Sequence, residues 1–179
     1  ILSHSTDGKG MSTSSSLTPE EVEGRLKSSM EQLSALGFNV NGWVTPSTWL
    51  KAEYLRLISK YYQYGFGHTD SNPESWAGYH SFDGRDIRHL DRWSLQSHAI
   101  EETMTAIQNC ITNCGFMCFY GHAYPSNDNM NEENMHTILS FLKAKADAGE
   151  IIVDVPRRAI NNYYAFRHSD YIALLGGTE

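Results

Sequence analysis

The sequence predicts an α/β fold in which parallel strands alternate with helices. Short apolar segments recur along the 179 residues, and the stretches between them carry apolar residues at intervals of three and four. This alternation implies βαβ crossovers and a parallel sheet or barrel. The composition, 40% hydrophobic and 12% aromatic, suits one globular domain over residues 1–179.

The first strand is expected at Ile1-Leu2, and a polar loop and a helix follow it. Thr18 and Glu21 form a capping-box pattern, and Pro19 suits the first helical position. Gly37 is expected to end the helix. Its apolar positions are Val22, Leu26, Met30, Leu33 and Leu36.

The next elements follow the same pattern. Residues 38–44 predict a strand, apolar positions from Leu50 to Tyr61 predict a helix, and residues 64–67 predict a short strand. Residues 69–89 are polar and lack periodicity, so we expect a long functional loop there. The remaining expected elements are a strand at 93–95, a helix capped by Ser97, a strand at 116–120, a helix ending at Gly149, a strand at 151–153 and a helix at 156–164.

The charge balance excludes some classes of partner. Lys and Arg total 14 against 21 Asp and Glu, a net charge of −7. Sequence-independent nucleic-acid binding needs cationic groups that displace counterions from phosphates, so we expect no nucleic-acid partner. No apolar run reaches the length of a membrane span, so we expect none. Ile1-Leu2-Ser3 resembles the end of a strand already under way, so we expect a longer chain before it.

The three cysteines lie close together in the sequence. Cys110, Cys114 and Cys118 are odd in number and lack the CxxC spacing of zinc ligands. We therefore interpret them as small buried hydrophobic residues.

Two histidines follow apolar segments at expected strand ends. His4 follows Ile1-Leu2-Ser3, and His122 follows Phe119-Tyr120-Gly121. Active sites of parallel α/β folds lie beyond the carboxyl ends of the strands. His122 is therefore a candidate catalytic group, and Gly121 would let a substrate approach it closely. The equally plausible alternative is a packed histidine that bonds a carbonyl near a turn.

A second candidate site lies in the loop after the first strand. His4 and Asp7 supply an imidazole and a carboxylate, both good zinc ligands, and a further ligand must come from elsewhere. The alternative is an Asx-type turn at Asp7-Gly8 beside a solvated histidine.

Aromatic and charged residues suggest substrate contacts. Trp43, Pro46 and Trp49 could form an apolar wall for a sugar ring, although such tryptophans are more often core anchors. Arg92 ends a run of alternating charges over residues 83–92, whose default interpretation is a solvated surface. One arginine of the run turned inward to orient a carboxylate is the alternative.

Taken in order, these segments resemble the polysaccharide deacetylase family, the carbohydrate esterases with a NodB-homology domain. ILSHS resembles the motif in which a strand enters a His-Ser dipeptide, GWVTP the proline loop that walls the groove, and FMCFYGHAY the strand that ends in a histidine. LDRWSL resembles a segment that carries an arginine before a short strand, and residues 138–164 resemble the closing helix, strand and helix. The resemblance covers nearly the whole chain but only the rear part of the family's domain.

The resemblance implies a distorted (β/α) barrel that is incomplete on its N-terminal side. It implies a metal-dependent hydrolase that removes acetyl groups from a polysaccharide or glycan. His4, with Asp7, would hold a divalent metal, most often zinc, and His122 would be the general acid. Substrate contacts would come from Trp43, Pro46, Tyr120 and Arg92. The implied setting is extracytoplasmic, at a cell surface or in a virion, within a larger multidomain or viral tail protein.

The sequence departs from the family pattern at three places. The motif with paired aspartates, which supplies the base that takes the water's proton, would precede Ile1. Gly8 stands where the second motif has another metal-binding histidine, and neither Val44 nor Thr45 is the usual arginine of the third motif. Gly8 and the missing arginine favour an alternative, an inactive domain that binds glycan without cutting it. A further alternative is an unrelated enzyme that uses His4 and His122 without a metal.

Overall fold

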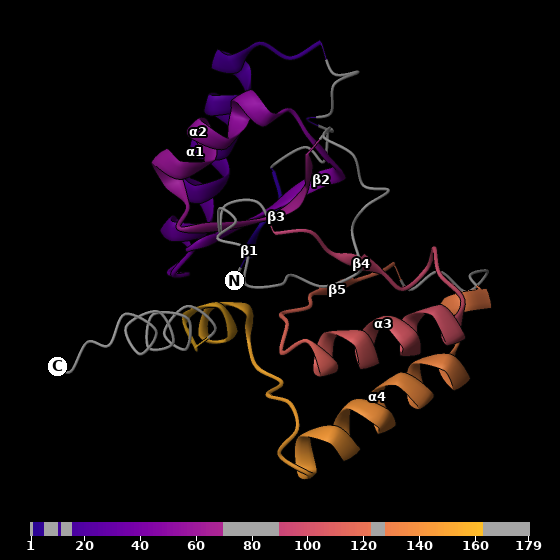
Figure 1. Cartoon of the computed structure of the whole chain (residues 1–179). Helices are drawn as coiled ribbons and strands as arrows, with labels where there is room; N and C mark the ends of the chain where they lie inside the picture. The colour runs from indigo at the N-terminus through magenta and orange to yellow at the C-terminus, as the bar shows by residue number, and fades with distance from the viewer. Residues whose placement is uncertain (1, 6–10, 12–15, 70–89, 123–127, 163–179) are drawn as a thin grey trace, which may run out of the picture. The chain divides into compact units, whose positions relative to one another are not determined.

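The strands form two parallel sheets in the computed structural model, which describes residues 2–5, 11, 16–69, 90–122 and 128–162 (Figure 1). The first sheet has the order β1 (Leu2–Ser3), β2 (Gly42–Leu50), β3 (Tyr64–Thr69). The second pairs β4 (Trp93–Ser94) with β5 (Phe119–Tyr120). Every one of these pairs is parallel, which confirms the predicted α/β class. No closed barrel is formed by the described part of the chain.

Helices follow the strands along the chain. They are α1 (Pro19–Ala35), η1 (Ala52–Tyr54), α2 (Leu55–Tyr61), α3 (Ile100–Thr112), η3 (Asp128–Met130) and α4 (Glu132–Asp147), and residues 156–162 are also helical. In the described ranges of the chain, no helix is both long and apolar enough to cross a membrane.

The contacts divide the chain into two units, each described by itself. Unit 1 comprises Ile1–Trp76 and Gly84–Arg92, and unit 2 comprises Ala77–Asp83 and Trp93–Glu179. Unit 1 therefore holds the sheet β1-β2-β3, and unit 2 holds the pair β4-β5. A single domain over residues 1–179 stays a prediction.

Helix α1 begins and ends at the residues that the sequence indicates. The Glu21 carboxylate accepts from the Thr18 main-chain N–H at 2.8 Å, and the Glu21 N–H donates to the Thr18 hydroxyl at 3.3 Å. Gly37 adopts a φ of +85° after the last turn. The N–H groups of Gly37 and Phe38 then satisfy the last free carbonyls, those of Ser34 and Leu33. The predicted capping box and glycine stop are confirmed.

Trp43 of β2 lies in the core of unit 1. Helices α1 and α2 lie side by side next to the sheet (Figure 1), and their apolar faces pack on the strand. The Trp43 and Tyr62 rings pack in a tilted arrangement with centroids 5.4 Å apart. The core cluster consists of Met11, Val22, Leu26, Trp43, Tyr54, Ile58 and Tyr62.

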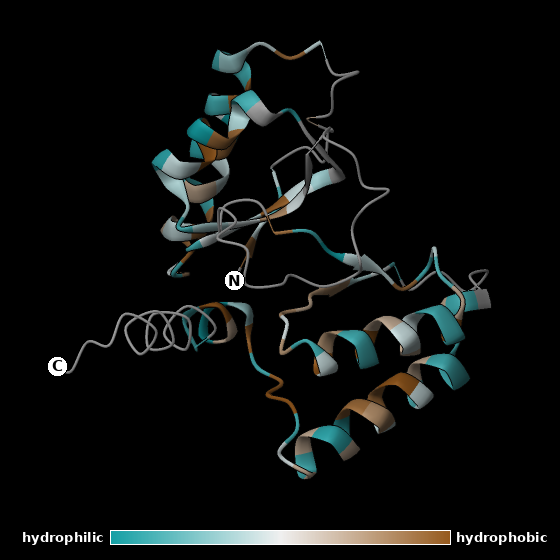
Figure 2. Ribbon diagram, viewed as in Figure 1, coloured by the Kyte–Doolittle hydropathy of each residue, from teal (hydrophilic) through white to brown (hydrophobic). Residues whose placement is uncertain are grey.

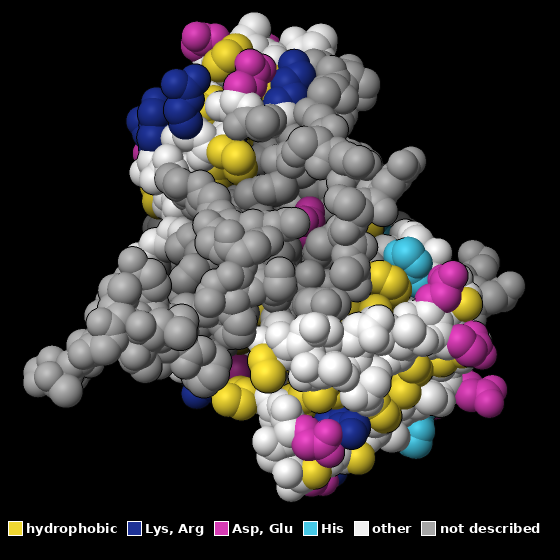
Figure 3. All heavy atoms as spheres, viewed as in Figure 1, with side chains coloured by type: hydrophobic (Ala, Val, Ile, Leu, Met, Phe, Trp, Pro, Cys, Tyr) yellow, Lys and Arg dark blue, Asp and Glu magenta, His cyan; other side chains and the backbone are white. Residues whose placement is uncertain are grey.

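In unit 2, β4 is tied to α3 by Trp93. The Trp93 indole Nε1 donates to the Thr103 hydroxyl at 3.0 Å, and both residues are buried. Helices α3 and α4 run side by side in Figure 1, and Figure 3 shows hydrophobic side chains gathered between them. The buried aliphatic and sulfur side chains of these helices include Ala106, Ile107 and Cys110 of α3 and Ile138 of α4.

Several predicted boundaries are wrong, including the start of the strand predicted at 116–120, which begins at Phe119. The second strand begins at Gly42 and continues to Leu50, so residues 38–41 are not part of it and Leu50 is not helical. The N-cap of α3 is Ala99, two residues after the predicted Ser97. Tertiary strand pairing decides such boundaries, and local pattern does not encode it.

The strand predicted at residues 151–153 is also wrong. This segment has no regular secondary structure and pairs with no strand of the described chain, and it forms the apolar stretch after α4 in Figure 2. Ile152 and Val153 are 77% and 66% exposed. A β-branched run favours extended backbone, but a strand also requires a neighbour that accepts its hydrogen bonds. The helix predicted at 156–164 is confirmed over residues 156–162, and its end lies outside the described residues.

Candidate functional site

His4 follows β1 and is held against β2. Leu2 pairs with Gly42 and Ser3 with Trp43, so the same register places His4 opposite Val44. The His4 ring Nδ1 lies 2.8 Å from the Val44 carbonyl oxygen. The strand before it is fixed by buried Ser3, whose hydroxyl bonds the Ser29 hydroxyl of α1. The exposed imidazole is therefore held by the sheet itself.

This bond assigns the proton on the His4 ring. A carbonyl oxygen only accepts, so Nδ1 must carry the hydrogen, and Nε2 of the neutral ring holds the lone pair. Metal-ligating histidines usually show this arrangement, with the second ring N–H donated to a carbonyl or carboxylate. His4 thus fits the role of one metal ligand through Nε2.

The rest of the predicted metal site is not found within the described residues. Asp7 and Gly8 lie outside them. No group of three or more His, Cys, Asp or Glu side chains in the described ranges is arranged to hold a metal ion. The described chain therefore supplies one fitting ligand, and the zinc site stays a prediction.

Trp43 and Pro46 lie inside unit 1. Trp43 is fully buried in the core cluster, and the Pro46 side chain is also fully buried. A buried indole offers no face to a sugar ring, so Trp43 takes the core-anchor role that the sequence left as its alternative. Nothing can be said of the Trp49 side chain, which lies outside the described side chains.

Arg92 is buried, unlike a typical residue of a solvated charge run. Its side chain is 7% exposed, and Nη2 donates to the Thr45 carbonyl oxygen at 3.3 Å. Thr45 directly precedes Pro46, where the third motif of the polysaccharide deacetylases has an arginine that this sequence lacks. The Arg92 guanidinium therefore lies beside that position of β2. Arg92 is therefore turned inward, whereas its role in orienting a catalytic carboxylate stays a prediction. Residues 83–89 of the run lie outside the described residues.

His122 follows β5 in unit 2 and is exposed. Its main-chain N–H donates to the Gln96 side-chain oxygen Oε1 at 3.0 Å, and its ring Nδ1 lies 2.8 Å from the same atom. The Tyr120 ring meets the imidazole edge to face, with centroids 6.5 Å apart. The histidine is thus oriented by a neighbouring side chain, and its functional role stays a prediction.

Gly121 does not leave room for a substrate, which corrects the expectation from the sequence. A Cβ atom at this position would collide with the Met130 thioether, so the space next to Gly121 is filled by that side chain. The glycine is needed here for the close packing of η3 against β5.

Among the cysteines, the predicted burial is confirmed for Cys110 and wrong for Cys114. Cys110 is buried, Cys114 is exposed, and Cys118 is intermediate. Burial raises the pKa of the Cys110 thiol to about 11, so it is unreactive at neutral pH. Cys114 follows the end of α3, where its side chain faces solvent.

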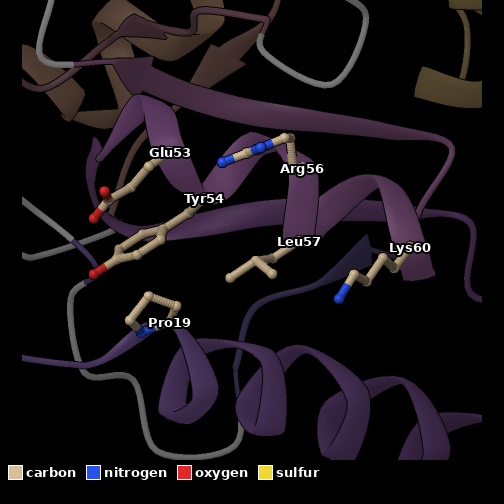
Figure 4. A pocket seen from close by; sticks show the side chains of 6 residues that line it. All are labelled: Pro19, Glu53, Tyr54, Arg56, Leu57 and Lys60. Atoms are coloured by element: carbon tan, nitrogen blue, oxygen red, sulfur yellow. The ribbon is translucent and has the colours of Figure 1, made fainter.

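A depression of about 320 Å³ lies between the start of α1 and the η1–α2 segment (Figure 4). In Figure 4, Tyr54 and Leu57 extend toward Pro19, and Arg56 and Lys60 stand at the rim. Lys60 is neutralised by Glu23, whose carboxylate lies 2.9 Å from Nζ, and that pairing lowers the Glu23 pKa. None of the predicted site residues lines this depression.

The predicted site residues are distributed over both units. His4, Trp43, Pro46 and Arg92 belong to unit 1, whereas Tyr120 and His122 belong to unit 2. Sequence reasoning missed Gln96, the partner of His122. The signal was present, because Gln96 directly follows the strand predicted at 93–95, and His122 lies two residues after the strand predicted at 116–120.

No family model matches the chain, and no curated protein is significantly similar to it. The resemblance to the polysaccharide deacetylases therefore rests on the order and spacing of the motifs quoted above.

Proposed function

We propose that this chain is a carbohydrate deacetylase that hydrolyses acetyl groups on a polysaccharide or glycan. One observation carries the proposal. His4 and His122 each follow a strand of a parallel pair, and each ring is held through Nδ1 by the residue opposite it on the neighbouring strand. Rigid imidazoles at the carboxyl ends of parallel strands are what metal ligation and proton transfer require. The fold proposed with it is the distorted (β/α) barrel of the polysaccharide deacetylases.

His122 is assigned the role of general acid. Water adds to the acetyl carbonyl and gives its proton to a general base, which in the polysaccharide deacetylases is an aspartate. The tetrahedral intermediate then collapses, and the bond to the sugar nitrogen or oxygen breaks. The protonated imidazole delivers its proton to that leaving atom, which would otherwise depart as a very poor anion. The products are acetate and a free sugar amine or hydroxyl. Tyr120, beside His122, is assigned to contact the substrate.

His4 is assigned as a ligand of a divalent metal, most often zinc in this family. When bound, such a metal lowers the pKa of a coordinated water and polarises a carbonyl. The contribution of the chain is to hold the His4 ring still, because Nδ1 is fixed by the Val44 carbonyl and Nε2 is the ligating atom. The buried Arg92 donates to the Thr45 carbonyl, directly before Pro46, and is assigned to order that part of β2.

Acetate release from acetylated glycans tests the proposal. The protein with zinc is expected to release acetate from N- or O-acetylated oligosaccharides. His122→Ala is expected to lower the rate by about 10²–10⁴-fold, the usual contribution of a general acid. His136→Ala is the matched control, because this exposed histidine lies on α4 in the same unit. Equal rates for the native protein and His122→Ala would refute the assignment.

A glycan-binding domain without catalysis is the second candidate. The observation that favours it is Gly8, at a position where the family has a metal-binding histidine. A metal-free protein that binds acetylated glycan and releases no acetate would establish it. Stoichiometric zinc together with acetate release would exclude it. In either case we propose an extracytoplasmic setting, at a cell surface or in a viral tail, where such glycans are met.

A further inference from the structure

Gln96 and His122 occupy equivalent places on the two strands of unit 2. Strand β4 pairs with β5 in the register Trp93 with Phe119 and Ser94 with Tyr120. The same spacing of 26 residues places Gln96 opposite His122, two residues beyond the last paired residues. The Leu95 N–H donates to the Tyr120 carbonyl at 3.0 Å, so the pairing continues to the residue before Gln96.

The hydrogen bonds between these residues determine which atoms carry hydrogen. The main-chain N–H of His122 can only donate, so the Gln96 atom 3.0 Å from it must be the amide oxygen. That oxygen can only accept, and it lies 2.8 Å from Nδ1. Nδ1 therefore carries the hydrogen, and in the neutral ring Nε2 holds the lone pair.

Gln96 is itself held in place on both sides. Its main-chain carbonyl oxygen accepts from the Asn129 side-chain amide at 3.2 Å. Its main chain continues β4, whose Trp93 is fixed to α3 through the Thr103 hydroxyl. An acceptor held in this way restricts the orientation of the imidazole as well as its tautomer.

We propose that Gln96 is the positioning residue of His122 and that Nε2 of His122 is the atom that exchanges the proton with the substrate. The catalytic part of this inference rests on the proposed function, whereas the hydrogen bond between Gln96 and His122 does not depend on it. The amide is neutral and accepts from Nδ1 in both protonation states of the ring. It therefore fixes the tautomer throughout the reaction without placing a negative charge beside the imidazole.

Nitrogen-15 NMR of the histidine side chains tests the tautomer without any substrate. The His122 signals are assigned by their loss in His122→Ala. In the native protein, at a pH where the ring is neutral, Nδ1 is expected to show the shift of a protonated nitrogen and Nε2 that of an unprotonated one. Gln96→Glu keeps an acceptor and should preserve this pattern, whereas Gln96→Met should shift His122 toward the Nε2–H tautomer.

Gln108→Met is the matched control, because it makes the same exchange on the exposed face of α3 in the same unit. It should leave the His122 signals unchanged. The main-chain amide of His122 should also exchange hydrogen faster in Gln96→Met, since it loses its acceptor. An Nε2–H tautomer in the native protein, or a tautomer that is unaltered in folded Gln96→Met, would overturn the proposal.

Activity then separates this inference from the proposed function. If the protein releases acetate, Gln96→Met should lower kcat about tenfold with little change in KM, and Gln96→Glu should keep more activity than Gln96→Met. An unchanged kcat in Gln96→Met would overturn the positioning role. If the native protein releases no acetate, the proposed function fails, whereas the NMR result still decides whether Gln96 fixes the ring.

Discussion

His4 in unit 1 and His122 in unit 2 are held by the same geometry but by different chemical groups. Each follows a short parallel strand, and each bonds through Nδ1 at 2.8 Å to the residue in register on the next strand. The acceptor of His4 is a main-chain carbonyl, that of Val44. The acceptor of His122 is the side chain of Gln96. The first arrangement depends on strand pairing alone, and the second depends on one replaceable residue.

The helices that follow the strands show the same contrast. Helix α1 of unit 1 has a complete capping box at Thr18 and a glycine in the left-handed conformation after its end. The N-cap of helix α3 in unit 2 is Ala99, which has no side-chain acceptor, and Cys114 occupies the left-handed position with a φ of +50°. Unit 1 thus uses the favoured residue at each of these positions, and unit 2 does not. The contrast predicts opposite effects of matched substitutions.

The largest effect is expected for Trp43→Ala, which removes the centre of the unit 1 core. Trp43 is fully buried and pairs in register with Ser3, directly before His4. Loss of a buried tryptophan usually lowers the free energy of unfolding by about 3–5 kcal/mol. Urea unfolding measures the loss, and Leu36→Ala, at a residue that is 72% exposed, is the control. A loss as small as that of the control would contradict the core role of Trp43.

The next largest effect on stability is expected at two glycines that lie close to neighbouring side chains, and its size should differ between them. A Cβ at Gly42 would meet the buried Tyr64 ring and Leu2, and at Gly121 the flexible end of Met130. We expect Gly42→Ala to cost about 1–3 kcal/mol, and Gly121→Ala less, because a thioether can move aside. Gly24→Ala, with nothing within 4 Å on helix α1, should instead stabilise by about 0.5–1 kcal/mol. Thermal unfolding of the three variants checks this order, and equal losses at Gly42 and Gly121 would count against it.

Cys114→Gly should stabilise unit 2 by about 1 kcal/mol, because glycine adopts the left-handed conformation without a Cβ clash. The Gly115 N–H already donates to the Cys110 carbonyl at 2.8 Å, so the terminal hydrogen bonds need no change. In unit 1, Gly37→Ala should do the reverse and destabilise by a similar amount, since its φ is +85°. Denaturant midpoints measure both shifts. A loss of stability in Cys114→Gly would show that the thiol makes a contact that outweighs backbone strain.

A slightly smaller gain is expected for Ala99→Ser, about 0.5–1 kcal/mol. The Glu102 carboxylate already accepts from the Ala99 N–H at 3.1 Å, so a serine hydroxyl would complete the capping box. Thr18→Ala removes the corresponding hydroxyl from α1 and should lose a comparable amount. Circular dichroism melts compare the pair. If both variants melt like the native protein, helix capping contributes nothing in either unit.

The smallest effect concerns the exposed pair of Glu23 and Lys60, which ties α1 to α2. The hydrogen bonds from Lys60 and Tyr61 lower the Glu23 pKa below 4.5. A lowered folded-state pKa means that this contribution is present above pH 4.5 and is lost as the pH falls through the folded value. Glu23→Gln should therefore lower stability slightly at pH 7 and not at pH 2. Unfolding at both pH values tests the sign, with Glu31→Gln as the control on the same helix.

Local signals predicted those parts of the fold that depend on local interactions. Helix α1 could be bounded from Thr18, Pro19, Glu21 and Gly37, since caps act within a few residues of a helix end. Residues 151–153 gave a false strand, because β-branched residues favour an extended chain but do not supply a partner strand. The length of β2 was missed for the same reason.

The candidate site was predicted in its residues more than in its contacts. Strand-end position identified His4 and His122, but the partner of each ring follows from strand register, which the sequence does not state. Gln96 was missed because its amide is uncharged and because the motifs quoted above assign it no role. The role of Gly121 was misread, since Met130 lies close to it in space but far along the chain. The inward orientation of Arg92 was only one of two alternatives, the other being a solvated surface.

We propose that acetate release requires both His4 and His122, and a double-mutant cycle on acetate release tests this proposal most directly. The rates of His4→Ala, His122→Ala and the double variant are compared with that of the native protein at saturating zinc. Residues that act as a unit are strongly non-additive, so we expect each single variant to lose at least about 100-fold and the double variant little more. A double variant whose loss is the product of the two single losses, or single variants with full activity, would contradict the account.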